Sequence, residues 1–176
     1  SRPYLAIVIT DLASEPSGIY IDPLFSAGVI ARIAIDVSKM EDVRSVLDLI
    51  STNRPQILST KPSVIAAMTS ASAECKPVAD LILVGGAALQ DHLRRAAQNL
   101  FSGAVASIYA TSELGVIGSE CAHGRMHIYE SDLLAIDDHP SAPSQIVVSN
   151  ISNEALPLES YQTGDAGTIS TERCVC

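Results

Sequence analysis

Short apolar runs alternate with helix-like segments through the first two thirds of the chain. The apolar runs have the length of β-strands and fall at residues 5–10, 30–37, 57–60, 81–84 and 104–109. Strands that alternate with helices are typical of a mostly parallel sheet flanked by helices. We therefore expect an α/β fold for this part of the chain.

The segments between these runs have helical spacing and recognisable helix ends. Ser38 and Glu41 form a capping-box pattern, which predicts a helix from there to about Thr52. Pro62 suits the first turn of a helix that ends near Ser70. A third helix is predicted from apolar residues that recur on one face: Leu89, Leu93, Ala97 and Leu100.

From about residue 115 the pattern changes to short alternating strands, which we expect at residues 126–130, 133–136, 145–150 and 167–171. This alternation favours a small antiparallel β-rich subdomain. No linker separates the two patterns. We predict an α/β subdomain over residues 1–114 that is followed by a β-rich subdomain over residues 115–176.

Composition excludes several classes of partner. The chain of 176 residues is 47% hydrophobic, which is enough for a core, and its formal net charge is −9. A nucleic acid or an anionic membrane would repel this surface. No apolar run approaches the roughly 18 residues that span a bilayer, so we expect a cytoplasmic protein with small-molecule ligands.

The run at residues 104–109 ends in Tyr109, Ala110, Thr111, Ser112 and Glu113. A nucleoside triphosphate site needs an aromatic ring, a hydroxyl group near phosphate and a carboxylate for magnesium. In open α/β sheets ligands bind at the carboxyl ends of strands. The alternative interpretation is a strand end with a cap supplied by Thr111 or Ser112.

A second motif, Tyr161-Gln162-Thr163-Gly164-Asp165, places a carboxylate on a tight backbone segment. Such a carboxylate can accept both hydroxyl protons of a ribose. The alternative is an ordinary turn between two strands.

The order of several motifs resembles that of phenylacetate-CoA ligases, which belong to the adenylate-forming superfamily. The resemblance covers roughly residues 80 to 176, and residues before 76 match only in pattern. It is carried by these segments: residues 84–89, 109–113, 120–121, 126–128, Glu130, 154–157 and 161–165.

This resemblance implies an adenosine site. Gly85, Gly86 and Ala87 would line the adenine pocket, and Tyr109 would lie against the base. Asp165 would hold the ribose hydroxyls. ATP or AMP is the implied nucleotide, and the implied partner is a small carboxylate, of an aryl or arylacetic acid.

The resemblance also implies the chemistry. Ala110 and Thr111 would border the nucleotide, Ser112 would meet the α-phosphate, and Glu113 would bind magnesium. The implied reaction joins the carboxylate to the α-phosphate of ATP to give an acyl-adenylate and pyrophosphate. Transfer of the acyl group to coenzyme A would follow, with Ser112 and Glu113 as the catalytic residues.

The sequence departs from the family pattern at several positions. Ala110 replaces a usual glycine, and Glu159, Ser160 and Gln162 stand where the pattern has isoleucine and two arginines. We find neither the Ser/Thr/Gly-rich phosphate loop nor the lysine-bearing C-terminal domain, so we expect this chain alone to be inactive. Two alternatives stay open: a non-catalytic nucleotide- or carboxylate-binding module, and a zinc-stabilised structural fragment. Strand edges left by missing segments also favour a homodimer or a partner chain.

The cysteine spacing suggests a metal site. Cys121 and His127 form one pair, and Cys174 and Cys176 form a second. Each pair can supply two ligands to a tetrahedral Cys3His zinc site, which would be structural because no position stays open for water. His123 is a competing ligand, and the alternative is four unligated thiols and a surface histidine.

Overall fold

The computed structural model describes residues 4–11, 18–24, 28–71, 76–129, 135–138, 145–150, 156–170 and 172–176. The chain divides into two compact units, residues 1–107 and 108–176, and each is described by itself. The boundary lies within a strand, seven residues before the point at which the sequence pattern changes. Among the described residues no helix is long and apolar enough to cross a membrane.

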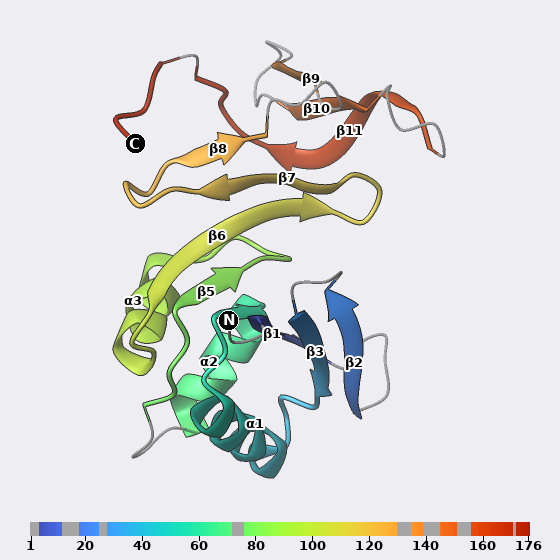
Figure 1. Cartoon of the computed structure of the whole chain (residues 1–176). Coiled ribbons are helices and arrows are strands. Elements are labelled where there is room, and N and C mark those ends of the chain that lie inside the picture. The colour runs from blue at the N-terminus through green and yellow to red at the C-terminus, as the bar shows by residue number, and fades with distance from the viewer. Residues whose placement is uncertain are drawn as a thin grey trace. The chain divides into compact units, whose positions relative to one another are not determined.

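The first unit contains a mostly parallel sheet, in the order β2-β3-β1-β4-β5-β6 (Figure 1). Only β2 runs antiparallel to its neighbour. Its strands are β1 (Tyr4–Asp11), β2 (Gly18–Leu24), β3 (Gly28–Ile35), β4 (Ile57–Thr60), β5 (Leu81–Val84) and the start of β6 (Ala104–Thr111). Its helices are α1 (Met40–Asn53), α2 (Pro62–Ala71) and α3 (Asp91–Leu100).

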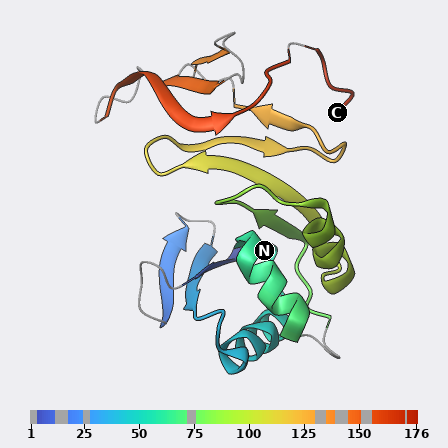
Figure 2. The same cartoon turned by 180° about the vertical axis from the view of Figure 1, so that it is seen from behind.

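The three helices cover one face of this sheet, with α2 between α1 and α3 (Figure 2). The connections explain why, because β3-α1-β4, β4-α2-β5 and β5-α3-β6 all advance across the sheet in the same direction. Crossovers of one hand place their helices on one side. The core forms beneath them from alternate strand residues such as Ile7, Leu58 and Ile82, which meet Ile50 and Ile65 of the helices.

Polar groups collect where the parallel strands end. Asp11 is the last residue of β1, and its carboxylate accepts a 2.6 Å bond from Lys61, which follows β4. The Ser63 hydroxyl donates to the same carboxylate at 3.2 Å. The hydrogen bond from the Lys61 ammonium is the main cause that lowers the pKa of Asp11, so this carboxylate is ionised near neutral pH.

The second unit is antiparallel. The end of β6 pairs with β7 (Gly115–Glu120), which pairs with β8 (Met126–Ile128). A separate three-stranded sheet has the order β11-β10-β9 and contains β9 (Ala135–Asp138), β10 (Gln145–Asn150) and β11 (Leu158–Ala166). The predicted α/β fold followed by a small antiparallel part is therefore confirmed.

Some local predictions were wrong. The first residue before α1 is Lys39, which makes no side-chain cap, and Ser38 instead donates its hydroxyl proton to Asp36 at 2.6 Å. The carboxylate of Asp36 competes successfully because it also accepts the Ser38 backbone N–H at 3.0 Å. The third helix starts at Asp91 rather than at Leu89.

The strand predicted at residues 167–171 was also wrong. Residues 167–170 form no strand, and Thr171 lies outside the described residues. The strand is β11 instead, which the composition hides because it contains Gly164 and an exposed polar face. Gly164 has φ of +82° and Ser160 φ of +50°, and irregular pairing with β10 accommodates both.

Candidate functional site

Tyr109 lies in β6, opposite Gly118 of β7, and a pairing irregularity follows it at Ala110. A three-residue turn then leads into β7, and the Thr111 hydroxyl accepts the backbone N–H of Leu114 at 3.1 Å. Thr111 thus caps a hairpin turn rather than a helix. The turn presents Ser112 and Glu113 to solvent.

Tyr109 and Asp165 meet in the second unit. The Tyr109 hydroxyl donates a hydrogen bond of 2.9 Å to Oδ2 of Asp165 on β11. Asp165 is also held by its own backbone N–H, which donates to the Thr163 hydroxyl at 3.2 Å. Thr163 in turn donates to the backbone carbonyl of Ile146 on β10 at 3.0 Å. The Asp165 carboxylate is therefore fixed beside the Tyr109 ring edge and stays exposed.

A second contact joins the same elements. Burial raises the pKa of Tyr161 on β11, and the nearby Glu113 carboxylate raises it further through its charge and a hydrogen bond. Tyr109 and Glu113 therefore both contact β11, which carries Asp165 and Tyr161 four residues apart. Two contacts therefore join these segments, one between Tyr109 and Asp165 and one between Tyr161 and Glu113.

The remaining expected nucleotide residues lie in the first unit. The backbone N–H of Gly85 donates to the carbonyl of Thr60 at 3.0 Å, and Gly85 is buried. Gly86 follows with φ of +79°, a conformation that favours glycine, and Ala87 is exposed. These residues form the turn after β5, at the carboxyl end of a parallel strand. Of the motif elements, Glu130 and residues 154–155 lie outside the described residues.

The four expected metal ligands come together at the end of β7 that is farther from the β6–β7 turn. A tight turn from Cys121 to Arg125 joins these strands, closed by Gly124 N–H to Cys121 O and Cys121 N–H to Arg125 O, both at 2.9 Å. Gly124 has φ of +74°. A Cβ on Gly118 would lie 2.4 Å from the His127 carbonyl oxygen, so only glycine lets β8 approach there.

Two of the distances between donor atoms match those around a tetrahedral zinc ion. The four ligand atoms of Cys121, His127, Cys174 and Cys176 all lie within 4.8 Å of one another. Cys121 Sγ is 3.8 Å from Cys174 Sγ, and Cys176 Sγ is 3.4 Å from His127 Nε2. Ideal zinc bonds place two sulfurs about 3.8 Å apart and a sulfur and nitrogen about 3.5 Å apart. This cluster can hold a metal, and His123 is not part of it.

The thiols of the cluster do not ionise independently. Desolvation opposes ionisation of Cys121, but hydrogen bonds led by the Arg125 backbone lower its pKa overall. A backbone hydrogen bond at Cys176 is the main cause that lowers the pKa of Cys174. The side-chain hydrogen bond between Cys176 and Cys174 is the main cause that raises the pKa of Cys176 to about 11. Three thiolates this close repel one another, and a divalent cation would relieve that repulsion.

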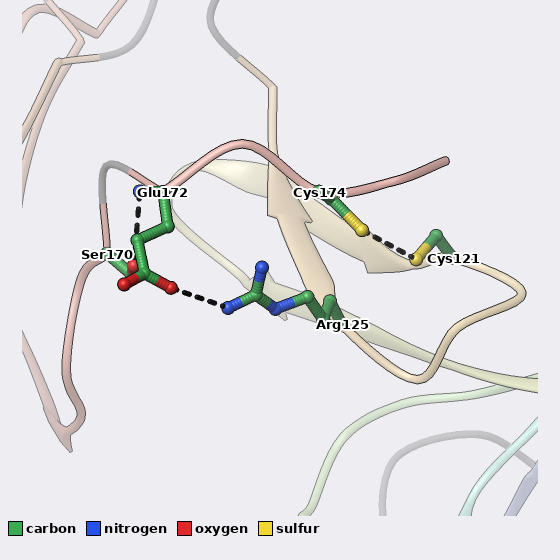
Figure 3. Close-up of polar contacts among 5 residues, drawn as sticks. All are labelled: Cys121, Arg125, Ser170, Glu172 and Cys174. Atoms are coloured by element: carbon green, nitrogen blue, oxygen red, sulfur yellow. Dashed lines mark hydrogen bonds and ion pairs between the residues drawn. The ribbon is translucent and has the colours of Figure 1, made fainter.

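A surface ion pair flanks the cluster. Arg125 lies in the hairpin turn and contacts the Glu172 carboxylate at 3.4 Å, and the backbone N–H of Glu172 donates to the Ser170 hydroxyl at 3.2 Å (Figure 3). Figure 3 also shows that this ion pair and the contact of Cys121 with Cys174 join the same two segments of the chain. The C-terminal segment is therefore attached to the hairpin at more than one point.

Sequence reasoning missed Tyr161 and Arg125. The sequence motif that begins at Tyr161 assigns no role to Tyr161 itself. The contact of Tyr161 with Glu113 depends on the path of β11, which was not predicted. Arg125 follows Gly124 in the turn that begins at Cys121. The signal that could have found it is its position between Cys121 and His127, since cations often accompany thiolates.

Comparison of the sequence with protein-family models and with curated proteins gives no match. The fold, in contrast, is similar to that of solved CoA ligases. An open form of 2-hydroxyisobutyryl-CoA ligase in complex with 2-HIB-AMP and CoA shares 11% identity at a TM-score of 0.63, over 94% of this chain and 40% of that chain. A benzoate CoA ligase from Burkholderia xenovorans shares 12% identity at 0.57, over 82% and 32%.

An unliganded O-succinylbenzoate coenzyme A synthetase from Bacillus subtilis shares 16% identity at a TM-score of 0.56, over 81% of this chain and 34% of that chain. The chain thus spans between 32% and 40% of the length of these three proteins. The fold of this chain is thus similar to part of the fold of these CoA ligases, as the resemblance implies.

We expect the purified chain to bind one zinc ion. His127→Ala should weaken zinc binding by at least about 100-fold, because an incomplete ligand set cannot replace the ion's hydration shell. Native mass spectrometry and competition with a chromophoric chelator measure stoichiometry and affinity. His123→Ala is the matched control, since it removes an exposed imidazole from the same turn region. Equal losses in the two variants would contradict the ligand assignment.

We expect Tyr109 to ionise above its ordinary pKa of 10.0. Burial is the main cause, and the Asp165 carboxylate adds to it, although Thr163 partly offsets the shift. Asp165→Asn removes a negative charge, so the pKa of Tyr109 should fall toward its ordinary value. Near-ultraviolet absorbance titration, with Tyr109→Phe subtracted, isolates this phenol from the five tyrosines. Asp48→Asn, on the exposed face of α1, should leave the titration unchanged.

Proposed function

We propose that this chain is the central part of an ATP-dependent ligase that activates a carboxylic acid, of the aryl or arylacetic class, as an acyl-adenylate and transfers it to coenzyme A. The observation that carries the proposal is the contact of Tyr109 with Asp165 at 2.9 Å, in a chain with the fold of part of a CoA ligase. These two residues are the ones that the family resemblance assigns to the base and the ribose. A cytoplasmic location belongs to the same proposal.

The proposed adenosine site is built mainly around Asp165. One carboxylate oxygen accepts a hydrogen bond from the Tyr109 hydroxyl. The exposed carboxylate still has lone pairs that can accept hydrogen bonds from the ribose hydroxyls. The Tyr109 ring offers a face for the adenine base. The family resemblance also assigns Gly85, Gly86 and Ala87 to the base, and a turn without large side chains lets a ligand approach the backbone.

The proposed phosphate contacts come from the β6–β7 turn. Ser112 is exposed and donates its hydroxyl proton to the α-phosphate, with Ala110 and Thr111 beside it. Glu113 is exposed too and supplies a carboxylate for magnesium, which is commonly held by one or two carboxylates together with phosphate oxygens. Magnesium would neutralise charge on the phosphates.

The reaction that these contacts serve has two steps. A carboxylate oxygen of the acid attacks the α-phosphorus of ATP, and the bond to pyrophosphate breaks. The thiolate sulfur of coenzyme A then attacks the acyl carbonyl, and AMP leaves. The chain's own contribution is to orient the α-phosphate and hold the ribose, because positioning and charge stabilisation dominate such transfers.

The metal cluster has a structural role in the proposal. Cys121, His127, Cys174 and Cys176 would hold zinc with four protein ligands, which leaves no position for a reacting water. The ion would connect the β7–β8 hairpin to the end of the described chain.

AMP should bind this chain in the presence of magnesium. Asp165→Asn should weaken binding about 10-fold, because a neutral amide accepts the ribose hydroxyls less strongly than a carboxylate. Isothermal titration calorimetry measures the affinity, and Asp48→Asn is the control for loss of one exposed carboxylate. Absence of heat with AMP, or identical affinities for the two variants, would sink the nucleotide assignment.

A second candidate is a non-catalytic module that holds a nucleotide. The observation in its favour is β11, where Glu159 and Gln162 are exposed and no arginine occurs. Polyphosphate would meet little positive charge on this strand. Pyrophosphate exchange into ATP, driven by phenylacetate or benzoate in a protein that includes this chain, separates the two functions. An active ligase should exchange label, and a binding module should bind AMP without exchange.

A further inference from the structure

The C-terminal segment, residues 156–176, meets the β6–β8 sheet through side chains. Its strand β11 pairs only with β10 among the described residues, and β6, β7 and β8 pair among themselves. No backbone ladder of the described residues joins these two sheets. The position of β11 against Tyr109 therefore depends on side-chain attachments.

These attachments follow one order along the segment. Tyr161 meets Glu113 in the β6–β7 turn, and Asp165 meets Tyr109, which lies opposite Gly118 of β7. Farther along, Cys174 meets Cys121 just after β7. The segment thus lies along β7, with the nucleotide residues at one end and the metal ligands at the other.

We propose that the metal at the four-residue cluster positions Asp165 for the nucleotide, so that metal and AMP each raise the other's affinity. This inference rests on the proposed adenosine site. Its ligands Cys121, His127, Cys174 and Cys176 are positioning residues, because they act through the segment and do not touch the nucleotide.

The distances along the chain support this coupling. Cys174 follows Asp165 by nine positions, and a flexible tether of that length has an end-to-end distance of roughly 17 Å. An anchored Cys174 restricts where Asp165 can lie. Without the anchor, the contact of Tyr161 with Glu113 remains, together with two weak exposed contacts. Glu172 in the ion pair with Arg125 is 81% exposed, and the Tyr109–Asp165 bond is exposed too.

Thermodynamic linkage makes the effect reciprocal. A metal that favours the attached segment also favours AMP, and AMP must raise metal affinity by the same factor. We expect a factor of about 10, within the range of roughly 5 to 150 that is common for coupled sites.

Two titrations of the full chain test the coupling. AMP with magnesium is titrated into zinc-loaded protein and into chelator-treated protein, and zinc is titrated by chelator competition with and without AMP. The expected result is AMP binding about 10-fold tighter with zinc, and zinc binding tighter by the same factor with AMP. Equal AMP affinities with and without zinc would overturn the coupling while the adenosine site stands. Absence of AMP binding in both forms would overturn the adenosine site as well.

Hydrogen exchange separates positioning from general unfolding. In metal-free protein, the backbone amides of residues 158–166 should exchange faster. The Tyr129 amide, which donates to the Ile117 carbonyl beside the β7–β8 ladder, should stay protected from exchange. Loss of protection across the whole second unit would instead make the metal a requirement for folding and overturn the positioning role. Asp165→Asn should reduce the coupling factor toward one, and Asp48→Asn should preserve it.

Discussion

Strand β6 is the element on which both units depend, because its backbone pairs in two different ways. Residues Ala104 to Ser107 pair in parallel with β5, and Ile108 to Thr111 pair antiparallel with β7. The first ladder completes the sheet beneath the helices, and the second starts the hairpin that carries the candidate sites. Tyr109 lies two residues beyond the change of partner. One continuous strand therefore contributes backbone pairing both to the sheet beneath the helices and to the hairpin of the second unit.

Within the second unit, the strengths of the attachments differ greatly. The Tyr109–Asp165 hydrogen bond and the Arg125–Glu172 pair are exposed, and such contacts contribute about 1 kcal/mol or less each. Structural zinc in small domains contributes on the order of 10 kcal/mol. In addition, a link between Cys121 and Cys174 closes a long loop, which reduces the conformational entropy of the unfolded chain. A bound metal would therefore dominate how the C-terminal segment is held.

The sequence predicted elements well where a buried face imposes a period. The runs at 57–60 and 81–84 match β4 and β5, and the helical spacing of Val43 to Ile50 matches the buried face of α1. β7 and β11 were not predicted. Half-exposed strands rich in glycine and polar residues show only a weak alternation of apolar and polar residues. The clustering of Cys121, His127, Cys174 and Cys176 was predictable because thiols and imidazole are rare and specifically spaced. The contact of Tyr161 with Glu113 was not, since it depends on how one sheet lies against another.

Charge limits what the proposed site can hold by itself. The second unit contains ten acidic residues against two arginines, which gives −8 of the chain's formal net charge of −9. Arg125 is already paired with Glu172. Because an acyl-adenylate carries about one negative charge and ATP carries about four, this surface disfavours the triphosphate far more than the adenylate. The side chains of this unit therefore suit the adenosine and α-phosphate, whereas the β- and γ-phosphates of ATP require magnesium and cations from outside this unit.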